Sequence, residues 1–456
     1  MKRGSRRSGP SAGHARLAPS YRSKPQSPPE TSMHPDSPTQ RLRVLATVTL
    51  LLALLALATG PAMANDWTQW GGPNADFSTS GEGLVTSWPE DGPPVLWRRT
   101  ISDHGHAAIL YEAGTLYTFV RRGDDDVALA LDAASGETKW EQVHASPLPE
   151  GYNRQFGPGP HATPLIAGER MFTISSLTRI QALDKQTGEL LWAHDLMQTM
   201  GAPMMGRGYG ASPVAWGDLV IAVVGGEGQG VVAFRQADGE VVWKALDGQG
   251  GYVTPRIAEI DGVPQVLVSL GATRAGLDPA TGEVLWTLEL RPESYTTMAP
   301  LFVVGDGEVF SSSAYADGSR VVKVTRAGDG WKAEEAWYSN KFQLMHQTAA
   351  RFGDLVYGSS GDFGPAFLAA IDVNDGEIAF RQRGFAKANL MRVGDRVLIL
   401  DEDGKLALGQ PKADGIEILA EAEVLAGTAW TVPTLVGTRL FVRNREEIVA
   451  LQLGDL

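Results

Sequence analysis

Polar and aromatic side chains gather in several loop segments of this chain, and their types could bind a ligand. Arginine and lysine can hold a carboxylate or phosphate through charge-assisted hydrogen bonds, and aromatic walls suit a small molecule. We therefore predict a ligand site whose candidate residues are Arg154, His161, Arg207, Tyr209, Tyr252, Tyr295, Lys341, His346 and Trp430. The basic residues favour an anionic ligand. The alternative is that these side chains plug a central channel and hydrogen-bond one another.

The residue types argue against metal binding and covalent catalysis. The chain has no cysteine, which excludes disulfides, thiolate nucleophiles and cysteine metal sites. His104, His106 and His161 are of a common ligand type, but three loop histidines alone are more often ordinary polar contacts. The acidic runs 124–126 and 401–403 lack the spaced ligands of a calcium loop, so we expect solvated turns there. We predict no metal site and no catalytic residue, although a nucleophile and its base can come from distant segments.

A repeated phrase indicates which elements position these loops. Ala-Leu-Asp-x-x-Thr-Gly-Glu-x-x-Trp is complete at residues 182–192, and altered copies occur at 130–140, 233–243, 276–286 and 370–380. Asp and Thr side chains hydrogen-bond a turn backbone and Gly accepts a positive φ, so each copy predicts a β-hairpin. A short Pro-containing segment and a second short apolar strand precede each hairpin. Four short strands that recur every 40 to 50 residues or so are typical of a propeller blade.

The repeat predicts an all-β, eight-bladed propeller of four-stranded antiparallel blades. The third strands fall near residues 130, 182, 233, 276, 323, 370, 407 and 450. The sequence ends just after the strand at 448–452, and an outer strand without its hairpin stands at 94–99. Pairing these N- and C-terminal strands would close the ring and remove exposed sheet edges. Seven blades is the alternative count if the altered copy near residue 409 is a loop.

The first 64 residues differ in composition from the rest of the chain. Residues 1–40 are rich in Ser, Pro and Arg and are expected to be disordered, with Met33 as an alternative translation start. Residues 41–64 combine arginines, a Leu-rich apolar run and Ala62-Met63-Ala64, which is typical of a cleaved signal peptide. The alternative is an uncleaved membrane anchor. We expect a periplasmic or secreted propeller that comprises residues 65–456 and is not inserted in a membrane.

The charge of the exported part excludes one class of partner. Residues 1–64 hold nine of the 40 Lys and Arg residues and two of the 53 Asp and Glu residues, which leaves a net charge of −20 for the remainder. Such an acidic protein repels nucleic acid and anionic membranes. We therefore expect no nucleic-acid partner.

The repeated phrase resembles the repeat of pyrroloquinoline-quinone (PQQ) propellers, and the resemblance covers residues 66–456. In that family each tryptophan docks between neighbouring blades. The matching residues are Trp97, Trp140, Trp192, Trp243 and Trp286, with Trp337 as a further candidate. The segments 66–74 and 87–97 also resemble exported bacterial proteins of this group.

Two branches of this group imply different functions. Quinoprotein dehydrogenases hold PQQ and calcium over the propeller axis, and many place an adjacent cysteine pair against the quinone, which this chain lacks. No Glu, Asn and Asp set matches their calcium ligands and catalytic base. The other branch is the propeller lipoprotein of the outer-membrane β-barrel assembly machinery, a binding scaffold without chemistry. This chain is similar to it in blade number but lacks its lipidated cysteine.

We therefore expect an exported non-catalytic binding or scaffolding propeller without a cofactor. Its expected partners are envelope proteins or a small anionic ligand. The alternative is a PQQ-dependent oxidoreductase that uses calcium and acts on alcohols or sugars. Fold and function separate in this architecture, so the site residues must decide between the two.

Overall fold

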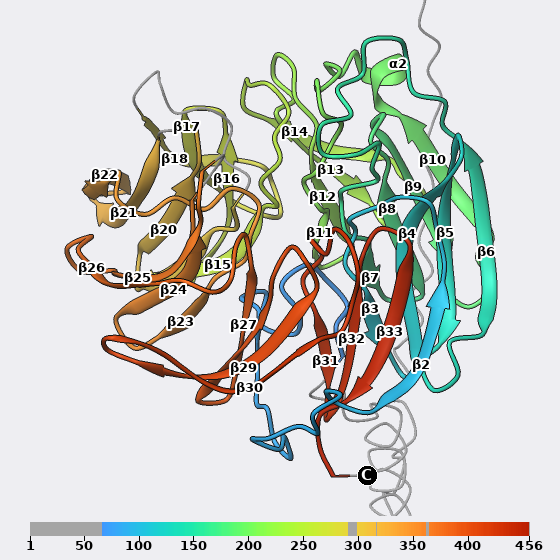
Figure 1. Cartoon of the computed structure of the whole chain (residues 1–456). Coiled ribbons are helices and arrows are strands. Elements are labelled where there is room, and N and C mark those ends of the chain that lie inside the picture. Colours follow the sequence, from blue (N-terminus) through green and yellow to red (C-terminus); the bar gives the residue numbers. More distant parts are fainter. Residues whose placement is uncertain (1–65, 291–298, 316, 362–363, 456) are drawn as a thin grey trace, which may run out of the picture. The chain divides into compact units, whose positions relative to one another are not determined.

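The computed structural model describes residues 66–290, 299–315, 317–361 and 364–455. This part of the chain folds into eight β-sheets that form the blades of a propeller ring, with one short helix, α2 (Leu196–Met200) (Figure 1). Among these residues, no helix is both long and apolar enough to cross a bilayer. The predicted disordered leader and signal peptide lie outside the described residues.

Each blade is a four-stranded antiparallel meander. Blade 1 has β3 (Leu110–Glu112), β4 (Thr115–Arg122), β5 (Asp125–Asp132) and β6 (Thr138–Ala145); blade 2 has β7 (Leu165–Ala167), β8 (Arg170–Ile174), β9 (Arg179–Asp184) and β10 (Leu190–Asp195). Blade 3 has β11 (Val214–Trp216), β12 (Leu219–Val223), β13 (Val231–Arg235) and β14 (Val241–Ala245); blade 4 has β15 (Arg256–Ile260), β16 (Val263–Leu270), β17 (Thr273–Leu277) and β18 (Val284–Glu289).

The later blades follow the same order. Blade 5 has β19 (Phe302–Gly305), β20 (Glu308–Ser313), β21 (Gly318–Ala327) and β22 (Gly330–Ser339); blade 6 has β23 (Ala350–Phe352), β24 (Leu355–Ser360), β25 (Phe367–Asp372) and β26 (Ile378–Gln382). Blade 7 has β27 (Asn389–Val393), β28 (Arg396–Leu400), β29 (Lys405–Lys412) and β30 (Gly415–Glu423); blade 8 has β31 (Thr434–Val436), β32 (Arg439–Arg443), β33 (Glu447–Gln452) and β2 (Val95–Thr100).

The predicted count of eight blades is confirmed. β29 is a paired strand of blade 7, so the seven-blade alternative is wrong. Closure is also confirmed, because β2 pairs antiparallel with β33 and places Trp97 opposite Ala450. Backbone pairing between the first and last blade strands of the sequence thus closes the ring.

The first strand of each blade lies at the centre of the ring. The first strands of neighbouring blades contact one another, as β3 does with β31 and β7 does with β11. The fourth strands form the outer rim, where every other side chain or more is at least partly exposed. The segments that precede the first strands therefore converge on one mouth of the channel.

Residues 66–85, here called the axial plug, join several first strands. A short strand within the plug, β1 (Ser78–Thr79), pairs in parallel with β27. The Trp67 backbone pairs with Tyr111 in β3, and its indole N–H donates to the Leu435 carbonyl in β31 at 2.7 Å. Arg256 in β15 donates to the Ala75 carbonyl. No sequence pattern indicated that this segment joins blades 1, 4, 7 and 8.

The repeated phrase makes both the hairpin and the contact between blades. Within blade 2, the Asp184 carboxylate accepts hydrogen bonds from the backbone N–H groups of Gln186 and Thr187 at 2.9 Å, which fixes the turn. Gly188 has φ 76°, and a Cβ there would lie 2.5 Å from the ring of Trp140 in blade 1. The Trp140 indole N–H donates to the Lys185 carbonyl at 2.9 Å. The glycine therefore serves the turn and also makes room for the tryptophan of the preceding blade.

The same docking recurs around the ring. Five tryptophans of the described chain make it: each ring covers the hairpin glycine of the next blade, and each indole N–H donates to a carbonyl of that hairpin. They are Trp97, Trp140, Trp192, Trp243 and Trp337. The small residue of the phrase lies opposite the tryptophan of its own blade, as Ala182 lies opposite Trp192. Packing thus explains why the phrase begins with a small residue and ends with tryptophan.

Trp286 differs from the predicted docking. It packs against Leu301 and Val322 of blade 5 and is 6% exposed, but its indole N–H donates to the Gln265 side chain of its own blade at 2.7 Å. Blade 5 lacks the Asp-x-x-Thr-Gly hairpin and so offers no glycine at the docking position. The Trp286 ring therefore still packs against the next blade, but its indole N–H makes no hydrogen bond to a backbone carbonyl in the described part of that blade.

Asp126 corrects one expectation about the acidic runs. Its side chain lies inside β5, fully buried, and forms an ion pair with Arg121 at 3.0 Å. Asp401 is also buried and accepts backbone hydrogen bonds from Asp403 and Lys405. The solvated-turn interpretation is therefore wrong for these two residues, because sequence alone did not locate the strand boundaries.

Replacing Trp192 with Ala is expected to lower the free energy of unfolding by about 3–5 kcal/mol, because the 9%-exposed ring would leave a cavity between blades 2 and 3. Denaturant titration measures this loss. Trp331→Ala is the matched control, since that ring is partly exposed and stacks on Arg326; it should cost about 1 kcal/mol or less. Equal losses for the two variants would contradict the docking role.

Candidate functional site

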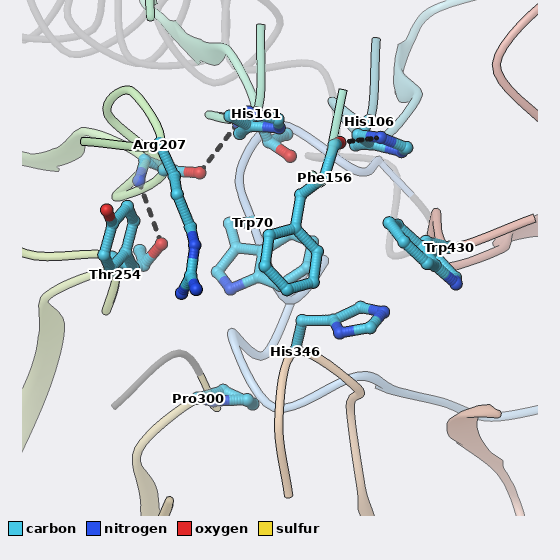
Figure 2. Close-up of a pocket in the computed structure, with 13 residues that line it drawn as sticks. Trp70, His106, Phe156, His161, Arg207, Thr254, Pro300, His346 and Trp430 are labelled. Atoms are coloured by element: carbon cyan, nitrogen blue, oxygen red, sulfur yellow. Dashed lines mark hydrogen bonds between the residues drawn. The ribbon is translucent and has the colours of Figure 1, made fainter. Parts of the chain in front are cut away.

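A cavity of about 120 Å³ lies where the segments before the first strands converge. Its walls come from the segments that precede the first strands of blades 1 to 6 and 8, and Trp70 of the axial plug also lines it (Figure 2). We call this cavity the axial pocket. The propeller ring therefore brings together side chains from both ends of the propeller sequence, such as His106 and Trp430.

The structure brings together five of the nine candidate residues. His161, Arg207, Tyr252, His346 and Trp430 line the axial pocket. Tyr295 lies outside the described residues. Whether the five bind a ligand stays a prediction.

The three remaining candidates lie elsewhere. Tyr209 is fully buried beside the pocket, and its hydroxyl bonds to the carbonyls of Pro203 and Val224, which is a structural role. Arg154 is exposed and does not line the cavity. Lys341 forms an exposed ion pair with Glu377 at 2.9 Å. Loop position in the sequence did not distinguish residues that face the axis from those that face solvent.

Aromatic and imidazole rings form one side of the axial pocket. His106 stacks on His161 with ring centroids 5.5 Å apart and also contacts Trp430 at 5.3 Å. Trp430 meets His346 edge-to-face at 4.7 Å. Phe156 lies among Trp430, His346 and Arg207 (Figure 2). Phe156 and Trp70 also line the pocket but were not predicted to do so.

The histidines of the pocket are neutral because they are buried beside cations. Burial lowers the pKa of His346 to about 3, and Lys387 acts in the same direction. Burial, with Arg445, lowers the pKa of His161 to about 4. Burial also lowers the pKa of His106 well below its usual value. Each ring therefore offers one N–H donor and one acceptor at neutral pH.

Several ring nitrogens have no hydrogen-bond partner among the described residues. They are both nitrogens of His346 and Nε2 of His161. The other nitrogen of His161 bonds to the Arg207 carbonyl, and His106 Nε2 lies 2.9 Å from the Phe156 carbonyl (Figure 2). Buried polar groups without partners are uncommon in folded proteins, so they need an explanation.

Two arginines contact rings of the pocket without a carboxylate within ion-pair distance among the described residues; Arg207 lines the cavity, and Arg445 does not. The Arg207 guanidinium lies over the Phe156 ring at 4.9 Å and donates to the Tyr315 hydroxyl at 2.9 Å. Arg445 lies over Trp430 at 5.1 Å. Arg445 was not predicted, because it lies in the turn between β32 and β33, and only the segments before first strands were expected at the mouth. Turns between second and third strands reach the same mouth.

The lining does not fit the PQQ and calcium pair of quinoprotein dehydrogenases. Calcium prefers carboxylate and carbonyl oxygens, and no Asp or Glu lines the described pocket. No group of three His, Asp or Glu residues suited to a metal occurs among the described residues. We therefore derive no redox step from this site.

The ring, its docking tryptophans and its repeats define a PQQ-like propeller. The family model described as outer membrane protein assembly factor BamB matches residues 72–153 and 149–382, which is more than half of the chain. The chain therefore belongs to this family.

Individual relatives are distant. The chain is similar to the outer membrane protein assembly factor BamB of Yersinia pestis, with 25% identity over 239 residues, 48% of this chain and 56% of that protein. The match thus spans little more than half the length of that relative.

Solved structures show the same fold. The crystal structure of BamB from Moraxella catarrhalis matches with a TM-score of 0.56 and 18% identity, over 79% of this chain and 97% of that one. The quinohemoprotein alcohol dehydrogenase from Comamonas testosteroni matches with a TM-score of 0.61 and 14% identity, over 88% and 82%. At these identities both likenesses concern the fold, so the choice of function needs other support.

The buried histidines predict a pH dependence of stability. The unfolded chain binds a proton at each histidine near pH 6.5, while folded His346 and His161 do so only near pH 3 and 4. The unfolded state thus binds more protons between these values, and stability falls as pH drops from 6.5 to 4. His346→Gln should reduce this loss of stability between pH 7.5 and 4.5 by about 2–3 kcal/mol. Denaturant titrations of the wild type and the variant at pH 7.5 and 4.5 measure the loss of unfolding free energy between the two pH values. An equal loss in both proteins would contradict a neutral buried His346.

Proposed function

We propose that this chain is an exported, non-catalytic scaffolding propeller that binds other envelope proteins during the assembly of outer-membrane proteins. The observation that carries the proposal is the family match across residues 72–382. The signal-peptide pattern at residues 41–64 supports export to the periplasm. The dehydrogenase alternative has less support, because the pocket lining offers no carboxylate for calcium.

An apolar rim on three consecutive blades is a suitable place for a protein partner. We define it as Leu190, Leu191, Val241, Val242 and Val284, each 36–44% exposed. These residues stand at the start of the outer strands β10, β14 and β18, just before the docked tryptophan. Exposed apolar patches with polar surroundings often mark protein interaction sites. The outer strands also have a free edge to which an extended segment could add.

The local structure explains why these side chains face solvent. The pairing of β10 with β9 shifts register between Leu190 and Trp192, and β14 shows the same shift before Trp243. A bulge turns the tryptophan inward and leaves two consecutive side chains outside. Burial within the blade is thus not available to them, whereas a partner could cover them.

A photo-crosslinking amino acid at Leu191 or Val242 is expected to capture an outer-membrane assembly protein in cells that make this chain. The matched control is Lys139, which occupies the same position on blade 1 but is charged and exposed. Mass spectrometry identifies the product.

The double variant Leu191→Glu, Val242→Glu should lower co-purification of that partner by about tenfold, because each charge would be buried in the interface. Unchanged thermal unfolding controls for folding. Equal capture at Lys139 would refute the rim as the docking surface. Dye-linked alcohol or sugar oxidation by the purified protein with PQQ and calcium would refute the non-catalytic role.

A further inference from the structure

The axial pocket has features that protein scaffolding does not use. It is a defined cavity rather than a packed axis. Ring nitrogens of His161 and His346 have no partner there among the described residues, and neither Arg207 nor Arg445 has a carboxylate at ion-pair distance in the same part of the chain. Together these features are those of a small-ligand site.

We propose that the axial pocket binds a small aromatic carboxylate, a flat monoanion of about the size of benzoate. The residues of this site are not those of the rim, so the proposal can be tested independently of the scaffolding role. Three properties of the pocket specify the ligand: its cations, its rings and its size.

The cations specify an anionic head group. Arg207 and Arg445 contact the pocket rings from two different blades, and each guanidinium lies over a ring face. Guanidinium groups bind carboxylates through paired, charge-assisted hydrogen bonds. Arg207 is held in place by the Tyr315 hydroxyl at 2.9 Å and by the Gln155 side chain at 3.3 Å. Because such a group is already oriented, little side-chain entropy is lost when an anion binds.

The described lining supplies no competing negative charge. One acid contacts a lining ring: Glu402 accepts from the Trp430 indole N–H at 3.1 Å and pairs with Lys387 at 3.4 Å. Its charge is therefore matched by Lys387. The chain as a whole is acidic, so the mouth of the pocket is a local positive exception that favours an anion over a cation.

The rings and the volume specify a flat, small body. The cavity of about 120 Å³ is comparable with an apolar cavity of about 150 Å³ that accepts benzene. Trp430, Phe156 and Trp70 offer ring faces and edges to an aromatic ligand. Such ring pairs contribute beyond the burial of area.

The neutral imidazoles complete the polar contacts. His346 has two buried nitrogens without partners among the described residues, and His161 has one. A neutral imidazole can donate to a carboxylate oxygen without bringing a further charge into the pocket. A bound carboxylate would thus satisfy the one N–H donor that neutral His346 leaves unpaired, whereas His161 already donates to the Arg207 carbonyl and presents Nε2 as an acceptor. Inorganic phosphate shares the charge but has no body to contact the rings.

Isothermal titration calorimetry of the purified protein with benzoate tests the proposal. We expect saturable one-to-one binding of benzoate, much weaker binding of benzamide, which has the same shape without the charge, and no detectable binding of inorganic phosphate. Arg207→Gln should weaken benzoate binding by at least about tenfold, because it removes a charge-assisted hydrogen bond. Arg445→Gln should also weaken it, because it removes the second positive charge beside the Trp430 ring. Arg439→Gln is the matched control, since Arg439 is an exposed arginine at the other end of β32.

The outcomes separate the proposal from its competitors. Benzoate binding that is lost in the two pocket variants and kept in Arg439→Gln supports it, provided that all variants unfold at the wild-type temperature. If an arginine variant unfolds at a lower temperature than the wild type, NMR spectra of the wild-type protein replace that variant as the test. Benzoate should then shift the ring signals of His346, and unshifted signals would refute the site. No benzoate binding, equal binding of benzamide, or binding of phosphate in place of benzoate each overturns the proposal.

Discussion

The structure depends on one contact between neighbouring blades, a tryptophan ring packed on a hairpin glycine. The tryptophan of one blade covers the glycine of the next, and its indole N–H donates to a carbonyl of the same turn. This contact requires glycine twice, for its positive φ and for its missing Cβ. It repeats at the closure, where Trp97 of blade 8 docks on Gly136 of blade 1. The ring is therefore joined in the same way where its two ends meet.

Because the ring is rigidly joined, the outer rim and the axial pocket are two surfaces formed by different residues. Outside, the bulges before the docked tryptophans of blades 2 and 3 expose apolar residues such as Leu191 and Val242 on the rim. Inside, the ring orients the segments before the first strands toward a pocket, and Trp70 of the axial plug lines it as well. Our proposals assign protein partners to the rim and a small anion to the axis. The two assignments use different residues and can be tested separately.

Much of the fold could be predicted from the sequence because the residues that make the docking contact recur in one short, repeated phrase. The spacing of Ala, Asp, Gly and Trp identified the hairpins, the eight blades and the closing strand. The site could be predicted only in part, because its residues meet through the ring and not through the sequence. Arg154 and Lys341 stand in loops like those of Arg207 and His346, yet they face solvent. Arg445 and the axial plug carried no pattern that indicated their place at the axis.

The docking contact is tested most directly by two glycines of blade 2. Gly188 and Gly168 both have positive φ, but a Cβ meets the Trp140 ring only at Gly188, and nothing lies within 4 Å of a Cβ at Gly168. Alanine should cost about 1 kcal/mol at either position for the backbone, and about 1–3 kcal/mol more at Gly188 for overpacking. In a Trp140→Ala background, denaturant titration should show the two glycine substitutions costing the same. Equal costs in the wild-type background would contradict the account.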